Sequence, residues 1–255
     1  MSFEPTDRLD GKVVVITGAK GAIGIASARR LAALGARVVS IDRSGRDEVL
    51  ALLAALPQVP SGAHLALTAS ITDSASLLAA AQAVQAQAGR ADILINSAGF
   101  TKAVPPGDLD GLTDALFDEI VQANLRGVFA TIRAFAPLLK ASGDGLIVNV
   151  SSIAGFTGAG SNLAYVAAKA GIDVLTKSLA KALAPQVRVL AVSPGVVDSS
   201  FVPGRGADFN DKAAATIPLK RIGTVEDIAS AIEACATPMR FATGSRFVVD
   251  GGRSL

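Results

Sequence analysis

Short apolar runs that alternate with longer Ala- and Leu-rich stretches restrict the fold of this 255-residue chain more than any other feature. Most of these runs are continuously apolar, without the polar alternation of a half-exposed strand, which is typical of strands buried on both faces of a parallel sheet. Helices must then cover both faces. The predicted strands are Val13–Thr17, Arg37–Ile41, Leu65–Leu67, Asp92–Ile95, Gly145–Val150, Val187–Val192 and Arg246–Val249.

The stretches between the runs carry the signals of helix ends. Ile23–Leu34 is followed by Gly35 and Ser74–Ala88 by Gly89, and glycine at a helix C-terminus readily takes the positive φ that ends the helix. Asp73 precedes the second of these helices as a predicted N-cap. The regular alternation of strand and helix predicts an α/β fold, a doubly wound parallel sheet of about seven strands with helices on both faces.

The domain organisation follows from what interrupts this alternation. Thr224 and Asp227 form a predicted capping box at the start of a late helix. No linker, composition break or internal repeat divides the chain, so we expect a single domain over residues 1–255. The segment 196–218 contains Pro203 and is too irregular for a strand and too broken for one long helix. We expect it to be a substrate lid, with an ordinary surface excursion as the alternative.

Composition excludes several classes of function. The net charge is +2 and the basic residues are scattered, so nucleic-acid binding is not expected. No apolar run reaches membrane-spanning length, and residues 1–10 contain no apolar leader, so we expect a cytoplasmic protein without membrane association. Cys235 is the single cysteine and His64 the single histidine, which predicts a reducing compartment and no metal site.

A glycine-rich turn follows the first predicted strand. Thr17-Gly18-Ala19-Lys20-Gly21-Ala22-Ile23-Gly24 runs directly into a helix, whose free N–H groups and positive dipole favour a pyrophosphate. The literal GxGxxG spacing is absent, and such a turn can also be purely structural. Asp42, at the end of the second strand, is placed to accept hydrogen bonds from an adenosine ribose and to repel a 2′-phosphate. This favours NAD(H), whereas neighbouring Arg43 leaves NADP(H) possible.

Three residues predict acid–base chemistry. Tyr165 and Lys169 are four residues apart in the predicted helix Ser161–Ala184, so both side chains project from one face. A phenol has a reference pKa of about 10 and is a poor base at neutral pH, but a nearby ammonium group stabilises the phenolate and so lowers this pKa. Ser152 follows a predicted strand, where α/β sheets bind their ligands, and is placed to hold a carbonyl oxygen.

These motifs together resemble the short-chain dehydrogenase/reductase family, in the same order and over almost the whole chain. The family's glycine-rich turn resembles Thr17–Gly24, and its Asn-Asn-Ala-Gly segment resembles Asn96-Ser97-Ala98-Gly99. The remaining matches are Asn124 in Ala123-Asn124-Leu125-Arg126-Gly127, Ser152 in Asn149-Val150-Ser151-Ser152, the signature Tyr165-Val166-Ala167-Ala168-Lys169, the loop Ser193-Pro194-Gly195, and the terminal Val-Asp-Gly-Gly of Gly244–Gly252.

The resemblance implies a Rossmann-like fold and a role for each matching residue. Ser152 would bind the reacting oxygen, and Tyr165 would exchange the proton on that oxygen. Lys169 would lower the pKa of Tyr165 and bind the nicotinamide ribose, and Asn124 would complete a proton relay. The cofactor-binding residues implied are Gly18, Lys20, Gly21, Ala22, Ile23, Gly24, Asp42, Arg43, Ser70, Ile71, Asn96, Ala98, Gly99, Tyr165, Lys169, Pro194, Gly195, Val197 and Ser199.

Three positions depart from the family pattern. Ala22 stands where the turn usually has its second glycine, and Gly21 lies one place earlier. Ser70 replaces the aspartate near the adenine, which weakens an expected adenine contact. Leu190 replaces an asparagine that is common before the Pro-Gly loop, and no functional conclusion follows from it.

The function expected is therefore an oxidoreductase that moves a hydride between a nicotinamide dinucleotide and a small or medium-sized secondary alcohol or ketone. An NADP-dependent 3-oxoacyl thioester reductase is the alternative, with Lys177 and Lys181 as candidate carrier-docking residues. A non-catalytic cofactor-sensing scaffold is the remote alternative. Lys102 and Arg205 are candidates for recognising an anionic substrate. The resemblance also implies a homotetramer, or a homodimer, built from the helices near Asn124–Lys140 and Tyr165–Ala184.

Overall fold

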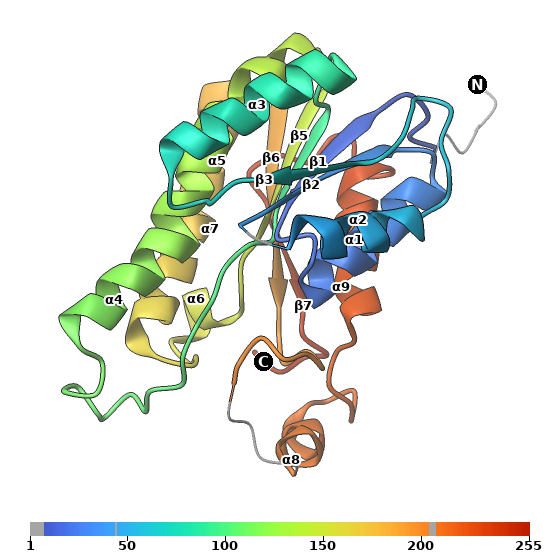
Figure 1. The fold of residues 1–255 in the computed structure, drawn as a ribbon. Helices are drawn as coiled ribbons and strands as arrows, with labels where there is room; N and C mark the ends of the chain where they lie inside the picture. Colours follow the sequence, from blue (N-terminus) through green and yellow to red (C-terminus); the bar gives the residue numbers. More distant parts are fainter. Residues whose placement is uncertain (1–7, 44, 204–207) are drawn as a thin grey trace.

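A computed structural model describes residues 8–43, 45–203 and 208–255, and all seven predicted strands form one parallel sheet within them. The strand order is β3-β2-β1-β4-β5-β6-β7. The chain therefore winds outwards from β1 in one direction and then returns to wind outwards in the other, as predicted for a doubly wound sheet (Figure 1). The strands are β1 Val13–Thr17, β2 Arg37–Asp42, β3 Leu65–Thr68, β4 Ile93–Asn96, β5 Gly145–Val150, β6 Val187–Pro194 and β7 Arg246–Val249.

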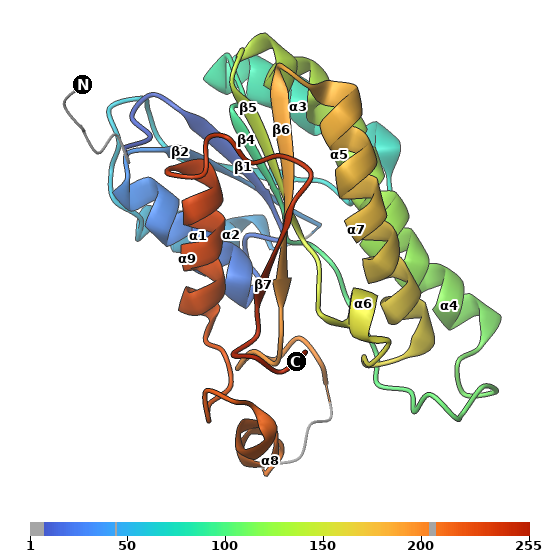
Figure 2. The same cartoon turned by 180° about the vertical axis from the view of Figure 1, so that it is seen from behind.

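Helices cover both faces of the sheet, as Figures 1 and 2 show. One layer contains α1, α2 and α9, and the other contains α3, α4, α5 and α7. The bounds of the helices are α1 Ala22–Ala33, α2 Arg46–Ala54, α3 Ser74–Ala88, α4 Asp114–Val121, the π-helix η1 Gln122–Arg126, α5 Gly127–Ala141, α6 Ala154–Thr157, α7 Leu163–Leu183, α8 Phe209–Thr216 and α9 Val225–Ala236.

The central strand β1 is buried along its length and supplies both faces of the core. Val14 and Ile16 pack in the hydrophobic cluster on the α1 and α9 side, whereas Val13 and Val15 pack in the cluster beneath α3, α5 and α7. This alternation follows from the two-residue period of a strand. Because both faces need apolar side chains, the run is apolar throughout, which is the pattern the sequence presents.

The predicted helix ends are confirmed. Asp73 caps α3 by accepting a hydrogen bond from the backbone N–H of Ala75 at 2.9 Å. Thr224 and Asp227 form both hydrogen bonds of a capping box at the start of α9. Arg221 also donates to both oxygens of Asp227, which holds the pKa of that carboxyl below its ordinary value. Local signals and the tertiary fold therefore agree at these positions.

The segment 196–218 combines loop and helix. Its described part contains α8 between two irregular stretches, while residues 204–207 lie outside the described residues. Figure 1 shows α8 beyond the carboxyl ends of β6 and β7, close to the C-terminus. The segment therefore lies at the end of the sheet where a doubly wound fold binds its ligands.

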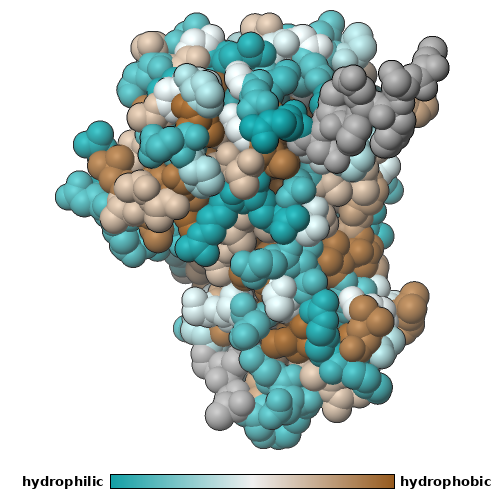
Figure 3. Space-filling view, turned by 90° about the vertical axis from the view of Figure 1, so that its right-hand side faces the viewer, coloured by the Kyte–Doolittle hydropathy of each residue, from teal (hydrophilic) through white to brown (hydrophobic). Residues whose placement is uncertain are grey.

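Hydrophobic residues are interspersed with hydrophilic ones on the side that carries α1, α2 and α9 (Figure 3). Among the described residues, no helix is both long enough and apolar enough to cross a bilayer.

Cys235 is buried on α9, and burial raises the pKa of its thiol to about 12. Within the same residues, no group of three His, Cys, Asp or Glu side chains is arranged to hold a metal ion.

Candidate functional site

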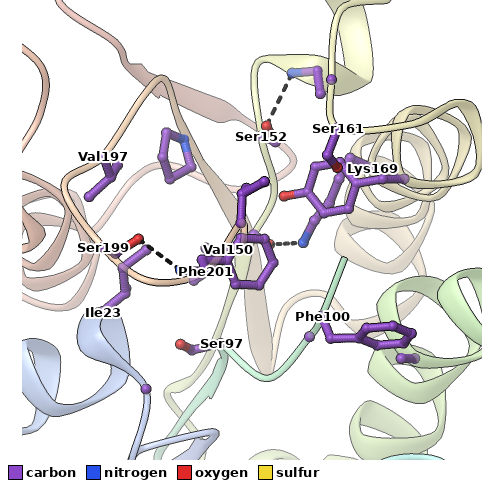
Figure 4. Close-up of a pocket in the computed structure, with 18 of the residues that line it drawn as sticks. Ile23, Ser97, Phe100, Val150, Ser152, Ser161, Lys169, Val197, Ser199 and Phe201 are labelled. Carbon is purple, nitrogen blue, oxygen red and sulfur yellow. Dashed lines mark hydrogen bonds between the residues drawn. The ribbon is translucent and has the colours of Figure 1, made fainter. Parts of the chain in front are cut away.

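A cavity of about 1570 Å³ lies at the carboxyl ends of the strands, where the sequence predicts a ligand site. Its walls include the turn before α1, the loops after β2, β3, β4, β5 and β6, and one face of α7. Figure 4 shows Ile23 at the start of α1 on one side and Lys169 of α7 on another. Segments far apart in the sequence therefore meet in one space.

The glycine-rich turn leaves room for a ligand backbone. Gly18 has a φ of +69°, and a Cβ atom there would lie 2.8 Å from the Cα of Ala98. Gly21 and Ala22 line the cavity, so α1 begins with free N–H groups facing it. Gly24 instead packs α1 against the turn, because a side chain at this position would collide with the Gly18 carbonyl. The turn thus fits a pyrophosphate although its spacing departs from GxGxxG.

Asp42 presents an oriented carboxylate at the end of β2. Its Oδ1 accepts a hydrogen bond from the backbone N–H of Lys20 at 3.3 Å, and its Oδ2 accepts one from the Ser40 hydroxyl at 2.6 Å. The Lys20 ammonium pairs with Glu48 at 2.6 Å, which offsets part of its positive charge. Arg43 is exposed and also lines the cavity.

The predicted adenine side is built from polar and apolar groups. Ser70 and Ile71 line the cavity, and the Ser70 hydroxyl shares a 2.9 Å hydrogen bond with the Thr72 hydroxyl. The serine therefore already has a partner within its own loop. Leu190 lies in the buried centre of β6 and does not reach the cavity.

Tyr165 and Lys169 lie on one face of α7, as their spacing predicts. The Lys169 Nζ lies 5.5 Å from the centroid of the Tyr165 ring and donates a 2.7 Å hydrogen bond to the Val150 carbonyl (Figure 4). Lys169 is only 5% exposed, and its burial lowers its pKa from 10.5 to about 8, while the charge of Asp173 opposes this change. The ammonium is therefore held beside the phenol ring by a fixed hydrogen bond.

Ser152 follows β5 and lines the same cavity. Its Oγ accepts a 3.1 Å hydrogen bond from the backbone N–H of Ala154, the first residue of α6 (Figure 4). Because this bond uses an oxygen lone pair, the hydroxyl hydrogen is left to donate to a ligand oxygen. The geometry suits the carbonyl-binding position predicted for this serine.

Asn124 lies behind the cavity wall rather than in it. Its amide donates to the carbonyls of Phe100 at 2.8 Å and Ile120 at 2.9 Å, and it lies within η1, a π-helical turn between α4 and α5. A Cβ atom on Gly99 would lie 2.5 Å from the Asn124 Oδ1, so the glycine permits this close approach. Asn124 therefore joins the loop after β4 to the helix.

Most of the predicted cofactor residues line the cavity. Asn96 is buried at the end of β4, where its amide donates to Asn149, and with Gly24 and Asn124 it lies behind the wall. The lining residues predicted from the sequence are Gly18, Lys20, Gly21, Ala22, Ile23, Asp42, Arg43, Ser70, Ile71, Ala98, Gly99, Ser152, Tyr165, Lys169, Pro194, Gly195, Val197 and Ser199.

A largely apolar part of the wall consists of side chains that were not assigned individually from the sequence. Phe201, in the loop after β6, lies with its ring centroid 6.0 Å from that of Tyr165 and tilted by 53°. The sequence places Phe201 in the predicted lid, and the loops Phe100–Asp108 and 196–218 are those expected to shape the substrate pocket. The other apolar lining residues include Phe100, Val104, Pro105, Pro106, Ile153, Val202 and Phe209.

Of the two charged residues expected to recognise an anionic substrate, only Lys102 can be compared with the structure. Lys102 is exposed and is not among the residues that line the cavity. Arg205 lies outside the described residues. Arg253 lines the cavity instead and donates a 3.1 Å hydrogen bond to the Thr216 hydroxyl. No sequence signal marked Arg253, because it reaches the cavity from the chain end after β7.

A doubly wound sheet, a glycine-rich turn before α1, a carboxylate at the end of β2 and a Ser-Tyr-Lys group lining one cavity are typical of a dinucleotide-dependent oxidoreductase. Comparison with known proteins agrees. The family model described as enoyl-(acyl carrier protein) reductase matches residues 18–254. The chain belongs to the short-chain dehydrogenase/reductase family, and it is an NAD(P)-dependent enzyme that acts on alcohol or ketone substrates. The scaffold alternative is therefore wrong.

Three relatives illustrate the similarity. D-threitol dehydrogenase from Mycolicibacterium smegmatis is 36% identical, over 97% of this chain and 95% of the relative. A 3-oxoacyl-[acyl-carrier-protein] reductase from Thermotoga maritima is 32% identical, over 96% of this chain and 98% of the relative. The crystal structure of a short-chain dehydrogenase/reductase, glucose/ribitol dehydrogenase, from Brucella melitensis is 31% identical with a TM-score of 0.86 and covers 99% of both chains.

Proposed function

We propose that this enzyme interconverts small or medium-sized secondary alcohols and ketones, prefers NAD(H) to NADP(H), and uses Tyr165 as its acid/base. When bound, the nicotinamide dinucleotide accepts or supplies the hydride. Ser152 donates its hydroxyl hydrogen to the substrate oxygen, and Tyr165 takes or returns the proton on that oxygen. The Lys169 ammonium, fixed by the Val150 carbonyl, favours the phenolate form of Tyr165.

The carboxylate of Asp42 is the observation that carries the cofactor preference. Both of its oxygens accept a hydrogen bond from neighbouring protein groups, so its orientation is fixed before a ligand arrives. A carboxylate in this position accepts hydrogen bonds from the two ribose hydroxyls and repels a 2′-phosphate. The pairing of Lys20 with Glu48 also reduces the positive charge available to a phosphate.

Thermal unfolding with each nucleotide tests the preference. A ligand that binds the folded state raises the melting temperature according to its affinity, and we expect NAD(H) to raise it more than NADP(H). Asp42→Asn removes the charge, so the NAD(H) shift should fall and the NADP(H) shift should rise. Asp47→Asn, at an exposed position on α2, is the matched control and should change neither shift. A larger shift with NADP(H) in the unmodified protein would contradict the preference.

The alternative function is an NADP-dependent reduction of 3-oxoacyl thioesters. It is favoured by the similarity to a 3-oxoacyl-[acyl-carrier-protein] reductase, and Lys177 and Lys181 are exposed on α7 as candidate carrier contacts. Acetoacetyl-coenzyme A is a simple probe for it. Faster turnover of this thioester with NADPH than of any secondary alcohol with NAD⁺ would move this alternative to first place.

We further propose that residues 196–218 act as a substrate lid. Phe201 and Phe209 line the cavity, and the Phe201 ring packs against Tyr165, so this loop forms part of the wall beside the proposed acid/base. Excluding water would strengthen the interactions of Ser152 and Tyr165 with the substrate oxygen. The lid thus contributes to the site through apolar side chains such as those of Phe201 and Phe209.

A second copy of the chain is the proposed partner. Figures 1 and 2 show α5 and α7 side by side, and a mainly apolar groove of about 400 Å³ between them is lined by Phe129, Ile132, Leu179 and Leu183 among others. Light scattering should give a homotetramer or a homodimer, and Phe129→Glu should lower the mass because it would bury a charge at the interface. Phe241→Glu, at a fully exposed position outside the groove, is the control. A monomeric unmodified protein would contradict the assignment.

A further inference from the structure

A buried carboxylate lies behind the catalytic wall and has no part in the mechanism above. Asp173 is 7% exposed and follows Lys169 by four residues on α7. Residues four apart lie on the same face of a helix, one turn from each other. Tyr165, eight residues before Asp173, is two turns away. The carboxylate is therefore closer along the helix to the ammonium than to the phenol.

Asp173 is held in place by two other elements. Its Oδ1 accepts a 2.7 Å hydrogen bond from the hydroxyl of Ser151, the residue that precedes Ser152. Its Oδ2 accepts a 2.7 Å hydrogen bond from the Nη1 of Arg246, the first residue of β7. The Arg246 guanidinium in turn lies 3.9 Å from the centroid of the Phe156 ring, which fixes it over the short helix α6. A buried acid with this many defined contacts is not an incidental surface charge.

The charges around Lys169 form a short series. Asp173 is the charged group that opposes the effect of burial on the Lys169 pKa, and Arg246 faces Asp173 from its other side. The Val150 carbonyl at the end of β5 and the hydroxyl of the next residue, Ser151, also lie here, and neither titrates near neutral pH. The ionisable side chains in line are thus Tyr165, Lys169, Asp173 and Arg246. Each carries the charge opposite to that of its neighbour when Tyr165 is a phenolate.

We propose that Asp173 is a positioning residue that keeps Lys169 charged, that Arg246 limits this effect, and that the two together set the pH range in which Tyr165 exchanges protons. This rests on the proposed function only for the role of Tyr165. Asp173 stabilises the ammonium more than it destabilises the phenolate, because it lies one turn from Lys169 and two from Tyr165. Arg246 neutralises part of the carboxylate charge, so its removal should have the opposite effect.

The composition of the chain supplies a direct test. Tyr165 is the single tyrosine and the chain has no tryptophan, so the tyrosinate absorbance of the intact protein follows the titration of this residue without any substrate. Asp173→Asn should move the midpoint of that titration to higher pH by up to about one unit, since Lys169 then loses its charge more easily. Arg246→Gln should move it to lower pH by a smaller amount. Opposite shifts are the expected result.

Two controls separate charge from structure. Ser151→Ala removes the hydrogen bond to Asp173 but leaves its charge, so its midpoint should stay near that of the unmodified protein. Arg246→Lys keeps a positive charge on β7 and should restore the unmodified midpoint. Equal midpoints for Asp173→Asn and Arg246→Gln, or shifts in the same direction, would show that Asp173 forms only a structural ion pair and would overturn the proposal.

The test stays informative if one variant fails or the proposed function is wrong. Arg246 is partly exposed, with 32% of its side chain accessible, so Arg246→Gln should fold even if Asp173→Asn does not. In that case a shift of the Tyr165 midpoint to lower pH in Arg246→Gln alone decides whether the proposal holds. If a Tyr165→Phe variant retained full turnover, the proposed function would fail whatever the midpoints. If that variant were inactive but the midpoints did not move, only the role of Asp173 would fail.

Discussion

Replacing Tyr165 with phenylalanine should reduce turnover by about 10²- to 10⁴-fold, the range that a positioned acid or base contributes. The substitution removes one oxygen atom and keeps the ring that packs against Phe201 and lies beside Lys169. Without the hydroxyl, the proposed acid/base is missing, so the proton of the substrate alcohol loses its acceptor. The cofactor walls formed by Asp42 and the glycine-rich turn are unchanged.

The measurement pairs turnover with cofactor binding. The rate is followed by NADH absorbance with a panel of small secondary alcohols and hydroxy acids, and the NADH-induced rise in melting temperature is recorded for both proteins. We expect an unchanged thermal shift and a large loss of rate, most of it in kcat. Retention of the rate would remove Tyr165 from the mechanism. Loss of the thermal shift would instead indicate a damaged nucleotide site.

Lys169→Met should abolish most activity and, at the same time, make the free protein more stable at neutral pH. Each pKa unit corresponds to about 1.4 kcal/mol, so lowering the Lys169 pKa from 10.5 to about 8 costs the fold about 3 kcal/mol. Methionine avoids this cost, but it leaves the Val150 carbonyl without its hydrogen-bond donor. This loss destabilises the folded protein by about 1–3 kcal/mol. A net gain of about 1 kcal/mol corresponds to a melting temperature about 2–4 °C higher.

The pH dependence of that gain gives its cause. Below about pH 8 the lysine is charged in both folded and unfolded states, so the whole penalty is present, and between about pH 8 and 10.5 the folded protein binds fewer protons and the penalty disappears. The advantage of Lys169→Met should therefore shrink as pH rises through this window. Lys177→Met, at an exposed position on the same helix, should show neither effect. A gain that did not change with pH would point to packing rather than charge.

The fold could be predicted closely because it depends on short-range patterns. Strands such as β1 and β5 are buried on both faces, so their central residues, Val13–Ile16 and Leu146–Val148, are all apolar and their ends are marked by glycine and polar residues. The capping box of α9 likewise depends on only four consecutive residues, Thr224 to Asp227. The spacing of Tyr165 and Lys169 on one helix face belongs to the same class of signal.

The parts that could not be predicted depend on contacts between distant segments. Asp173 and Arg246 are 73 residues apart, and nothing in either local sequence indicates that they pair. Arg253 reaches the cavity only because β7 lies at the edge of the sheet beside β6. Asn124 matched a motif, but its place behind the wall follows from the π-helical turn that brings its amide to the Phe100 carbonyl. Such features require the tertiary structure.

The burial of Cys235 has a practical consequence for following the proposed lid in solution. It is the single cysteine, and burial raises its pKa to about 12, so it carries almost no thiolate at neutral pH and should not react with maleimide dyes. A Ser200→Cys substitution would then place one reactive thiol on the exposed part of the loop beside Phe201. A fluorophore attached there would report the motion of that loop alone, in a protein whose own fluorescence lacks any tryptophan contribution.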